Sequence, residues 1–321
     1  MKVLIIGGGG MVGQKLAHRL AAEGLGGNTP DVTLYDIGYP EGGAPASQRL
    51  TGNFAEPGEA QRLADLRADV IFHLAAIVSG EAEINFDLGW QVNLHATMGL
   101  LESLRAAHAA DGYKPRLIFA SSIAVFGAPF PEKIDDEFLC APRTSYGAQK
   151  AMSELLIGDH ARKGYIDAIA LRLPTICVRP GKPNKAASSF FSNIIREPLV
   201  GQEAVLPVPD TVRHWHASPR SAAGFMIHAA TLDFAKLDGR IALNLPGVSC
   251  TVAEQIEALE AVAGSGATKL IRQEPDPAIF TIVKGWPRDF SPDRARALGF
   301  RAEDNFREIV QTHIDDELPN N

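Results

Sequence analysis

The chain has 321 residues, of which 45% are hydrophobic and 21% charged, which predicts one large or two ordinary globular domains with a sizeable core. The formal net charge of -7 argues against a nucleic-acid partner, and no block of Lys and Arg overrides it. Without an apolar run of roughly 18 residues or a signal-peptide pattern, we expect no membrane partner and a cytoplasmic location.

The first half of the chain alternates strand and helix patterns. Residues 2–6 form a short apolar run, typical of a strand buried on both faces, and a helix with Val12, Leu16 and Leu20 on one face is expected next, ending near Gly24. Further strands are predicted at 32–36, 69–73, 116–120 and 168–172, and helices at 88–109 and from Ser145 onward. This alternation predicts an α/β fold with a doubly wound parallel sheet of the Rossmann type.

The pattern changes after Pro174. Residues 179–210 are rich in proline and cationic side chains, and only shorter elements follow, including helices near 252–263 and 304–315. We therefore expect a smaller mixed C-terminal lobe. The predicted dinucleotide-binding domain is 1–175, with parts of 210–250, and the predicted substrate-binding lobe is 176–209 and 251–321.

Cysteine is scarce and scattered. Cys140, Cys177 and Cys250 form no C-x-x-C pair and are odd in number, so neither a disulfide framework nor a zinc site is expected. This pattern suits a reducing compartment.

A glycine-rich turn follows the first predicted strand. Gly7, Gly10 and Gly13 have the G-x-x-G-x-x-G spacing. Glycine permits a sharp turn and lets a pyrophosphate approach the helix N-terminus, where unpaired N–H groups favour an anion. A glycine-rich turn without a ligand is the alternative, but the position between a strand and an amphipathic helix favours dinucleotide binding.

Asp36 ends the second predicted strand. A carboxylate there can bind the adenosine ribose hydroxyls and would repel a 2′-phosphate. No Arg follows directly to neutralise that phosphate, so NAD is the expected cofactor rather than NADP. A solvated strand-end Asp is the alternative.

Tyr146 and Lys150 are four residues apart on one predicted helix and share a face. A nearby cation lowers the pKa of a phenol toward the range of a useful base. The spacing alone is a weak signal. Ser121 and Ser122, at the end of a predicted parallel strand, strengthen it, because open α/β sheets place ligands at such ends. A surface Tyr–Lys pair is the alternative.

With these motifs the chain resembles the extended short-chain dehydrogenases/reductases, the group that includes nucleotide-sugar epimerases and dehydratases. The resemblance covers nearly the whole chain and rests on the glycine turn, Asp36, the segment 73–76, Asn93, the segment 121–127 and the pair Tyr146/Lys150. It implies that Ser122 contacts the reacting oxygen, that Tyr146 accepts the proton and that Lys150 also holds the nicotinamide ribose. Besides Tyr146 and Lys150, the cofactor contacts that the resemblance implies are Gly7, Gly10, Met11, Val12, Gly13, Asp36, Asn53, Leu74, Ala75, Ala76, Asn93 and Pro174.

Two departures refine the resemblance. Dehydratases of the group carry Asp-Glu after the catalytic hydroxyl, where this chain has Ile123 and Ala124, so elimination of water is not expected. The segments 76–81, 173–184 and 212–216 instead resemble the D-erythronate dehydrogenases, which oxidise the C2 hydroxyl of a four-carbon sugar acid with NAD. The expected partner is therefore a small sugar-acid substrate.

The carboxylate of such a substrate needs a cationic partner. Arg213 is the first choice, because a guanidinium binds a carboxylate through two parallel hydrogen bonds. Arg179 and Lys182 are second choices, and Ser79 could donate to a remote hydroxyl. A structural ion pair or a diphosphate contact are the alternatives for Arg213.

His214 and His216 would point to one face of a strand. No third ligand accompanies them, so packing or substrate contact is favoured over a metal site.

Two rival functions stay open. A nucleotide-sugar 4-epimerase would use the same Ser–Tyr–Lys set with NAD retained throughout. A non-catalytic NAD sensor would have no use for an intact set. A homodimer formed through the two long helices is what the resemblance implies for the oligomeric state.

Overall fold

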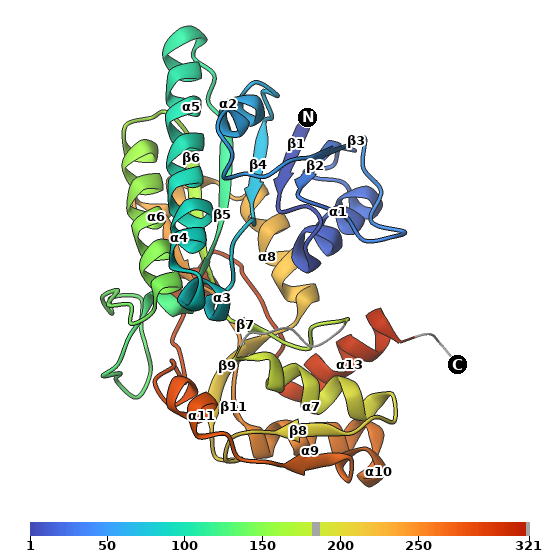
Figure 1. Ribbon diagram of the computed structural model, residues 1–321. Coiled ribbons are helices and arrows are strands. Elements are labelled where there is room, and N and C mark those ends of the chain that lie inside the picture. Colours follow the sequence, from blue (N-terminus) through green and yellow to red (C-terminus); the bar gives the residue numbers. More distant parts are fainter. Residues whose placement is uncertain (182–186, 319–321) are drawn as a thin grey trace. The chain divides into compact units, whose positions relative to one another are not determined.

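A parallel sheet organises the first of the two units into which the chain divides in the computed structural model (Figure 1). The structure describes residues 1–181 and 187–318. The first unit consists of Met1–Val125, Pro142–Arg172 and Ala223–Leu243. The second unit consists of Phe126–Ala141, Leu173–Ala222 and Asn244–Asn321.

Over the described residues the sheet has seven strands in the order β10-β6-β5-β4-β1-β2-β3, which confirms the predicted doubly wound parallel sheet. The strands are β1 (Lys2–Ile6), β2 (Asp31–Asp36), β3 (Gln48–Thr51), β4 (Val70–His73), β5 (Arg116–Ser122), β6 (Asp167–Leu173) and β10 (Ala242–Asn244). β1 pairs in parallel with both β2 and β4, and β4 with β5. The order therefore reverses between β1 and β4, and ligands of such sheets bind at the carboxyl ends of the strands beside this reversal.

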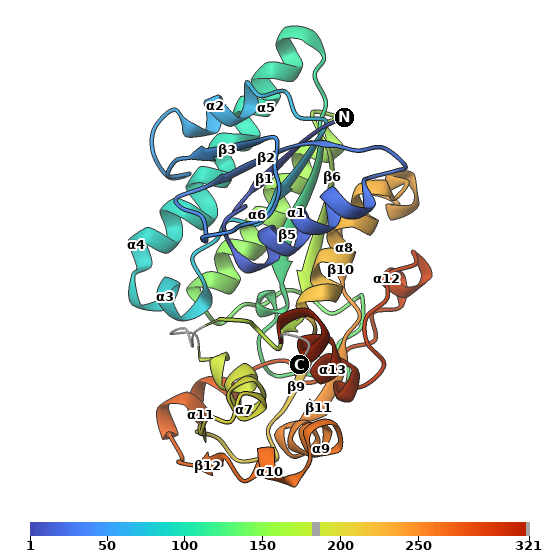
Figure 2. The same ribbon diagram turned by 90° about the vertical axis from the view of Figure 1, so that its right-hand side faces the viewer.

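Helices cover both faces of this sheet, which explains why its central strands read as continuous apolar runs. Both views place α2, α5 and α6 on one face and α1 and α8 on the other (Figures 1 and 2). The helices of this part of the chain are α1 (Met11–Glu23), α2 (Glu59–Ala64), α3 (Ser79–Ile84), α4 (Phe86–Gly89), η1 (Trp90–His95), α5 (Ala96–Asp111), η2 (Ile123–Val125), α6 (Ser145–Arg162), α8 (Pro219–Thr231) and η3 (Phe234–Leu237).

The predicted long helix over 88–109 is confirmed as helical but is not uniform. It starts at Phe86, passes through the π-helical turn η1 and continues as α5. β3 and α2 were not predicted from the sequence. β3 is a mostly exposed edge strand with a single apolar residue, Leu50, so it lacks the apolar run that marks the central strands.

The second unit has its own core and a small mixed sheet, as the sequence predicts. β11 pairs with β9 antiparallel and β7 with β9 parallel, while β12 and β8 form a separate parallel pair. The elements are β7 (Thr175–Ile176), α7 (Ser189–Leu199), β8 (Ala204–Leu206), β9 (Arg213–Ala217), β11 (Val248–Thr251), α9 (Val252–Ala263), α10 (Ser265–Thr268), β12 (Ile271–Gln273), α11 (Pro277–Val283), α12 (Asp293–Ala297) and α13 (Phe306–Glu317).

The predicted helices near 252–263 and 304–315 are confirmed as α9 and α13. α7 lies in the proline-rich stretch and was not predicted, although its residues Phe190, Phe191, Ile194 and Ile195 are all buried in the core of this unit. Among the described helices, none combines the length and the apolar character that crossing a bilayer requires.

Candidate active site

The turn between β1 and α1 leaves no room for a side chain at Gly7 or Gly13. Gly7 has a φ of +91°, and a Cβ there would lie 2.5 Å from a backbone nitrogen of the segment after β4. A Cβ on Gly13 would collide with the Gly7 carbonyl oxygen. The N-cap Gly10 offers no side-chain acceptor, so the first-turn amides of Met11, Val12 and Gly13 have no capping side chain. This backbone cradle at a helix N-terminus fits the pyrophosphate of a dinucleotide.

Asp36 lies beside this turn at the end of β2. Its Oδ2 accepts a hydrogen bond from the Gly9 N–H (2.9 Å) and its Oδ1 accepts one from the Ile37 N–H (2.7 Å). The carboxylate therefore fixes the glycine turn and stays half-buried where the ribose recognition was predicted. Asn53 is exposed, and its side chain bonds Ala55 and Glu56 within its own loop.

The segment after β4 lies against the same turn. The N–H groups of Leu74 and Ala75 both donate to the Ile6 carbonyl, at 2.8 and 2.9 Å, and Leu74, Ala75 and Ala76 are half-buried. Their backbone therefore borders the glycine cradle, as expected for residues that line a cofactor. Because β1 and β4 flank the reversal of strand order, this is the edge where a ligand is expected.

Asn93, one of the predicted cofactor contacts, has a buried side chain that is hydrogen-bonded to two other elements. Its amide bonds both the N–H and the carbonyl of Ile77, at 2.8 and 3.0 Å, and it donates to Gln149 Oε1 at 2.7 Å. Asn93 thus ties the segment after β4 to α6. The sequence gives no signal for this role, because it depends on a side chain that reaches two other elements.

The structure brings Tyr146 and Lys150 together on α6. Lys150 Nζ lies 5.6 Å from the centre of the Tyr146 ring. Ser122 ends β5, where its Oγ accepts a hydrogen bond from the Ala124 N–H. The first turn of α6 packs directly on the residues after Ser122, because a Cβ on Gly147 would collide with the Ala124 carbonyl oxygen. This arrangement suits a base, a cation and a hydroxyl that serve one reacting group.

Lys150 is buried, with 1% of its surface exposed, and its Nζ donates to the Ala120 carbonyl at 2.7 Å. Burial lowers the pKa of this ammonium to about 7, and the charge of Glu154 opposes that shift. Burial, with a smaller contribution from the charge of Lys150, also lowers the pKa of His73 to about 3. His73 is therefore a neutral neighbour at neutral pH.

Glu154 and Arg172 were not singled out from the sequence. Their side chains form a buried ion pair at 2.8 Å, and Ser121 Oγ donates to Glu154 Oε1. A signal existed, because Glu154 follows Lys150 by four residues and so continues the face that Tyr146 and Lys150 share. Without the fold, an acidic residue at that spacing looks like an ordinary surface pair.

The remaining predicted substrate residues are divided between the units. Ser79 begins α3 in the first unit, and Pro174 is buried in the second. In the second unit, Arg179 donates to the Ile176 carbonyl and to Ser188 Oγ. Lys182 lies outside the residues that the structure describes.

Arg213, also in the second unit, begins β9. It pairs with Glu254 at 3.1 Å and donates to the Ser249 carbonyl, and 38% of its side chain is exposed. The ion pair that the sequence left open as an alternative is therefore present. It is a partly exposed pair, of the kind that contributes little to stability.

His214 and His216 both point into the core of the second unit. The His214 ring stacks on Phe191 and bonds Thr175 Oγ1 at 2.7 Å, and His216 bonds Gln255. Burial lowers the pKa of His214 to about 4 and holds that of His216 well below its ordinary value. Within the described residues no cluster of three or more possible ligands accompanies them, so their arrangement is that of packed, neutral side chains.

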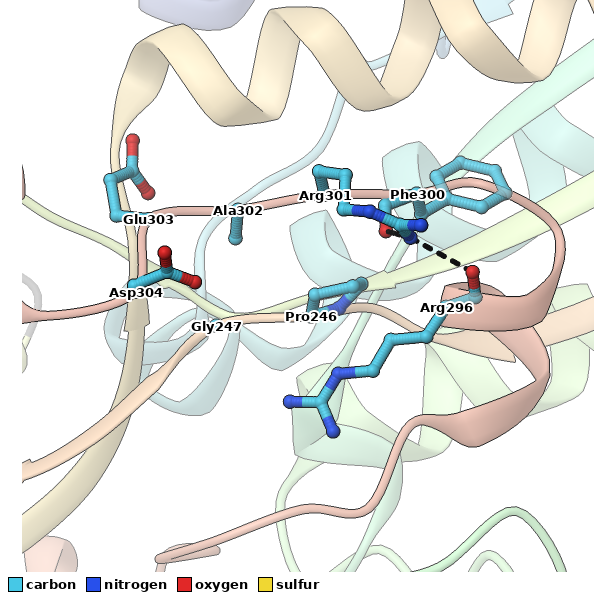
Figure 3. A pocket seen from close by; sticks show the side chains of 8 residues that line it. All are labelled: Pro246, Gly247, Arg296, Phe300, Arg301, Ala302, Glu303 and Asp304. Atoms are coloured by element: carbon cyan, nitrogen blue, oxygen red, sulfur yellow. Dashed lines mark hydrogen bonds between the residues drawn. The ribbon is translucent and has the colours of Figure 1, made fainter.

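The second unit also has a pocket of about 320 Å³ (Figure 3). Its lining consists of Pro246, Gly247, Arg296, Phe300, Arg301, Ala302, Glu303 and Asp304. Arg301 donates to the Arg296 carbonyl, and Glu303 accepts hydrogen bonds from Ser218 and Ser221. None of the predicted site residues lines this pocket. Its Arg301 and Glu303 are hydrogen-bonded to the neighbouring backbone and to the start of α8.

Residues 3–217 match the model of the NAD dependent epimerase/dehydratase family. This range includes the glycine turn, Asp36, Ser122, Tyr146 and Lys150.

Two relatives are named D-erythronate dehydrogenase. The one from Cupriavidus necator is 42% identical over 323 residues, which cover 98% of each chain. The one from Haemophilus influenzae is 43% identical over 317 residues, which cover 98% of this chain and 99% of the relative.

Solved structures are similar over the same length. A crystal structure from Agrobacterium tumefaciens, described as a nucleoside-diphosphate-sugar epimerase, is 57% identical with a TM-score of 0.95, and the match covers 99% of this chain and 94% of that one. An L-threonine dehydrogenase from Cupriavidus necator has a TM-score of 0.85 at 23% identity, over 98% of this chain and 99% of that one. At that identity the likeness shows a shared fold.

The cradle leads to a prediction for Gly13→Ala. The added methyl group must displace the Gly7 carbonyl and open the turn, so we expect the Kd for NAD to rise by about tenfold or more, as measured by titration calorimetry. Gly158→Ala is the matched control, because a Cβ there would lie 3.8 Å from Ile241 in ordinary contact. Wild-type affinity in Gly13→Ala would show that the turn does not hold the dinucleotide.

Proposed function

The chain belongs to the NAD dependent epimerase/dehydratase family, and from this premise we propose that it oxidises the C2 hydroxyl of D-erythronate to give 2-dehydro-D-erythronate. The family confirms the predicted resemblance to the extended short-chain dehydrogenases/reductases and the predicted cofactor, NAD. The observation that carries the proposed substrate is the identity of 42% and 43%, over nearly the whole chain, to two D-erythronate dehydrogenases.

In the proposed reaction, Tyr146 as phenolate accepts the proton of the C2 hydroxyl, and Ser122 Oγ holds the reacting oxygen. NAD, when bound, supplies the hydride acceptor, so that the C–H and O–H bonds break as the C=O bond forms. Lys150 stabilises the phenolate by its charge and binds the nicotinamide ribose. The residues thus supply positioning and proton transfer.

The choice of NAD over NADP is proposed to depend on Asp36. Its carboxylate is anchored by two backbone amides, which keeps a negative charge at the ribose position. A 2′-phosphate would meet that charge without a neighbouring Arg in the sequence to neutralise it.

We propose Arg213 as the partner of the substrate carboxylate. Its ion pair with Glu254 is partly exposed, so replacing Glu254 by a substrate carboxylate would cost little free energy. Arg179 remains the second candidate; its guanidinium already donates to a backbone carbonyl and to Ser188. Ser79 is the proposed donor to a remote hydroxyl.

A nucleotide-sugar 4-epimerase is the second candidate function. The observation that favours it is the name nucleoside-diphosphate-sugar epimerase, carried by the 57% identical structure from Agrobacterium tumefaciens. An epimerase would return the hydride to the sugar and release no NADH. Net NADH formation therefore separates the two candidates.

We also propose a cytoplasmic homodimer. The free thiols of Cys140, Cys177 and Cys250 support a reducing compartment. For the domains, we propose that residues 1–175, with parts of 210–250, bind the dinucleotide and that 176–209 and 251–321 bind the substrate.

The first experiment follows NADH absorbance with NAD and a panel of sugar acids. We expect NADH formation with D-erythronate, little with NADP, and a loss of about a hundredfold or more in Tyr146→Phe, because proton transfer is removed. NADH binding by Tyr146→Phe should stay near that of the wild type. No NADH with any acid, together with interconversion of a UDP-hexose without added cofactor, would make the protein an epimerase.

Arg213→Met tests the carboxylate partner. Loss of a charged hydrogen-bonding group should raise the KM for D-erythronate by about tenfold or more with NADH affinity unchanged. Arg220→Met is the matched control, because Arg220 is a similarly exposed member of an Arg–Asp pair in the same unit. A KM that responds to Arg179→Met and not to Arg213→Met would transfer the role to Arg179.

A further inference from the structure

A buried ion pair lies one helical turn beyond Lys150, and the proposed reaction does not use it. Glu154 of α6 is 6% exposed, and the side chain of Arg172 on β6 is 13% exposed. Arg172 donates from Nη2 to Oε2 at 2.8 Å and from Nε to Oε1 at 3.0 Å. Removing two charges from water costs free energy that the ion pair does not always recover. A role beyond stability is therefore worth seeking for this pair.

A third element completes the cluster. Ser121, 2% exposed at the end of β5, donates its hydroxyl to Glu154 Oε1. The carboxylate thus receives hydrogen bonds from both β5 and β6 while it remains on α6. Ser121 and Arg172 therefore hold the Glu154 carboxylate in one position on α6, on the helix face that it shares with Lys150 four residues earlier.

Lys150 is enclosed by elements that offer it little other compensation. β5 contributes the Ala120 carbonyl and the Phe119 ring, whose centre lies 4.5 Å from Nζ. β4 contributes His73, which burial keeps neutral. α6 itself contributes Tyr146, whose ring centre lies 5.6 Å from Nζ, and Glu154, which pairs with Arg172 of β6. Among the described residues, Glu154 is the carboxylate whose charge acts on Lys150.

The energetic consequence follows from burial. An ammonium out of water loses its proton readily unless a negative charge is near, and burial lowers the pKa of Lys150 to about 7 while Glu154 acts against this shift. Without the proton, Lys150 could no longer stabilise a Tyr146 phenolate.

We propose that Glu154 is a positioning residue of the active site, held by Ser121 and Arg172, and that it supplies the buried negative charge that keeps Lys150 an ammonium ion. The inference rests on the proposed role of Lys150. Arg172 orients Glu154 in this arrangement, because it donates to both oxygens of the carboxylate.

The test titrates Lys150 directly in the full-length protein, labelled with carbon-13 at lysine Cε. The Lys150 signal is assigned by its disappearance in Lys150→Arg. In Glu154→Gln we expect the midpoint of this titration to fall by about 1 pH unit or more, because an opposite charge nearby is lost. Glu154→Asp retains the carboxylate and should keep most of the wild-type midpoint, which separates the effect of charge from that of shape.

One further variant makes the result specific. Glu102→Gln removes an exposed carboxylate that also pairs with an arginine, Arg105, and should leave the midpoint unchanged. A general disturbance of the fold would move the midpoint in Glu154→Asp as much as in Glu154→Gln. An unchanged midpoint in Glu154→Gln, or an equal fall in Glu154→Asp, would overturn the proposal.

The titration needs neither substrate nor turnover. Failure to form NADH from D-erythronate would therefore refute the proposed function and leave this result standing. Conversely, an active enzyme with an unshifted Lys150 in Glu154→Gln would refute the role of Glu154 alone.

Discussion

β1, β4 and β5 run in parallel as neighbours, so their carboxyl ends meet at one edge of the sheet. The glycine turn follows the first of these strands, the segment 74–76 follows the second, and Ser122 ends the third. Residues far apart in the chain are thereby placed at one edge of the sheet. The helices that cover the sheet then determine what else reaches that edge, and α6 brings Tyr146 and Lys150.

Placing an ammonium ion there has consequences for the surrounding interior. Lys150 is as buried as the apolar core, and so are its neighbours His73 and Ser121. The interior responds in two different ways: burial keeps His73 neutral, while Glu154 is held in an ion pair with Arg172 and accepts a hydrogen bond from Ser121. The polar neighbours of Lys150 thus differ in how they respond to its charge. Their arrangement follows from the cost of leaving a buried charge without a partner.

Much of this could be predicted from the sequence, because the informative residues are local signals. The apolar run at 2–6 and the spacing of Gly7, Gly10 and Gly13 are short patterns with direct structural meaning, and the structure contains the strand, turn and helix that they predict. What could not be predicted depends on distant partners. Asn93 of η1 bonds Ile77, which follows β4, and Glu154 of α6 pairs with Arg172 of β6. β3 carries no pattern at all, because an exposed edge strand needs no apolar face.

The two hydrogen bonds of Asp36 bear on how cofactor preference can evolve or be engineered. Oδ2 accepts the Gly9 amide, so the residue expected to discriminate against a 2′-phosphate is also one that shapes the pyrophosphate cradle. A swap at position 36 to a side chain without an oxygen, such as Ala, removes the negative charge and also the acceptor of the Gly9 N–H. A switch toward NADP in this chain therefore has to remove the charge and keep an oxygen acceptor for Gly9, so Asp36→Asn is expected to preserve the turn better than Asp36→Ala.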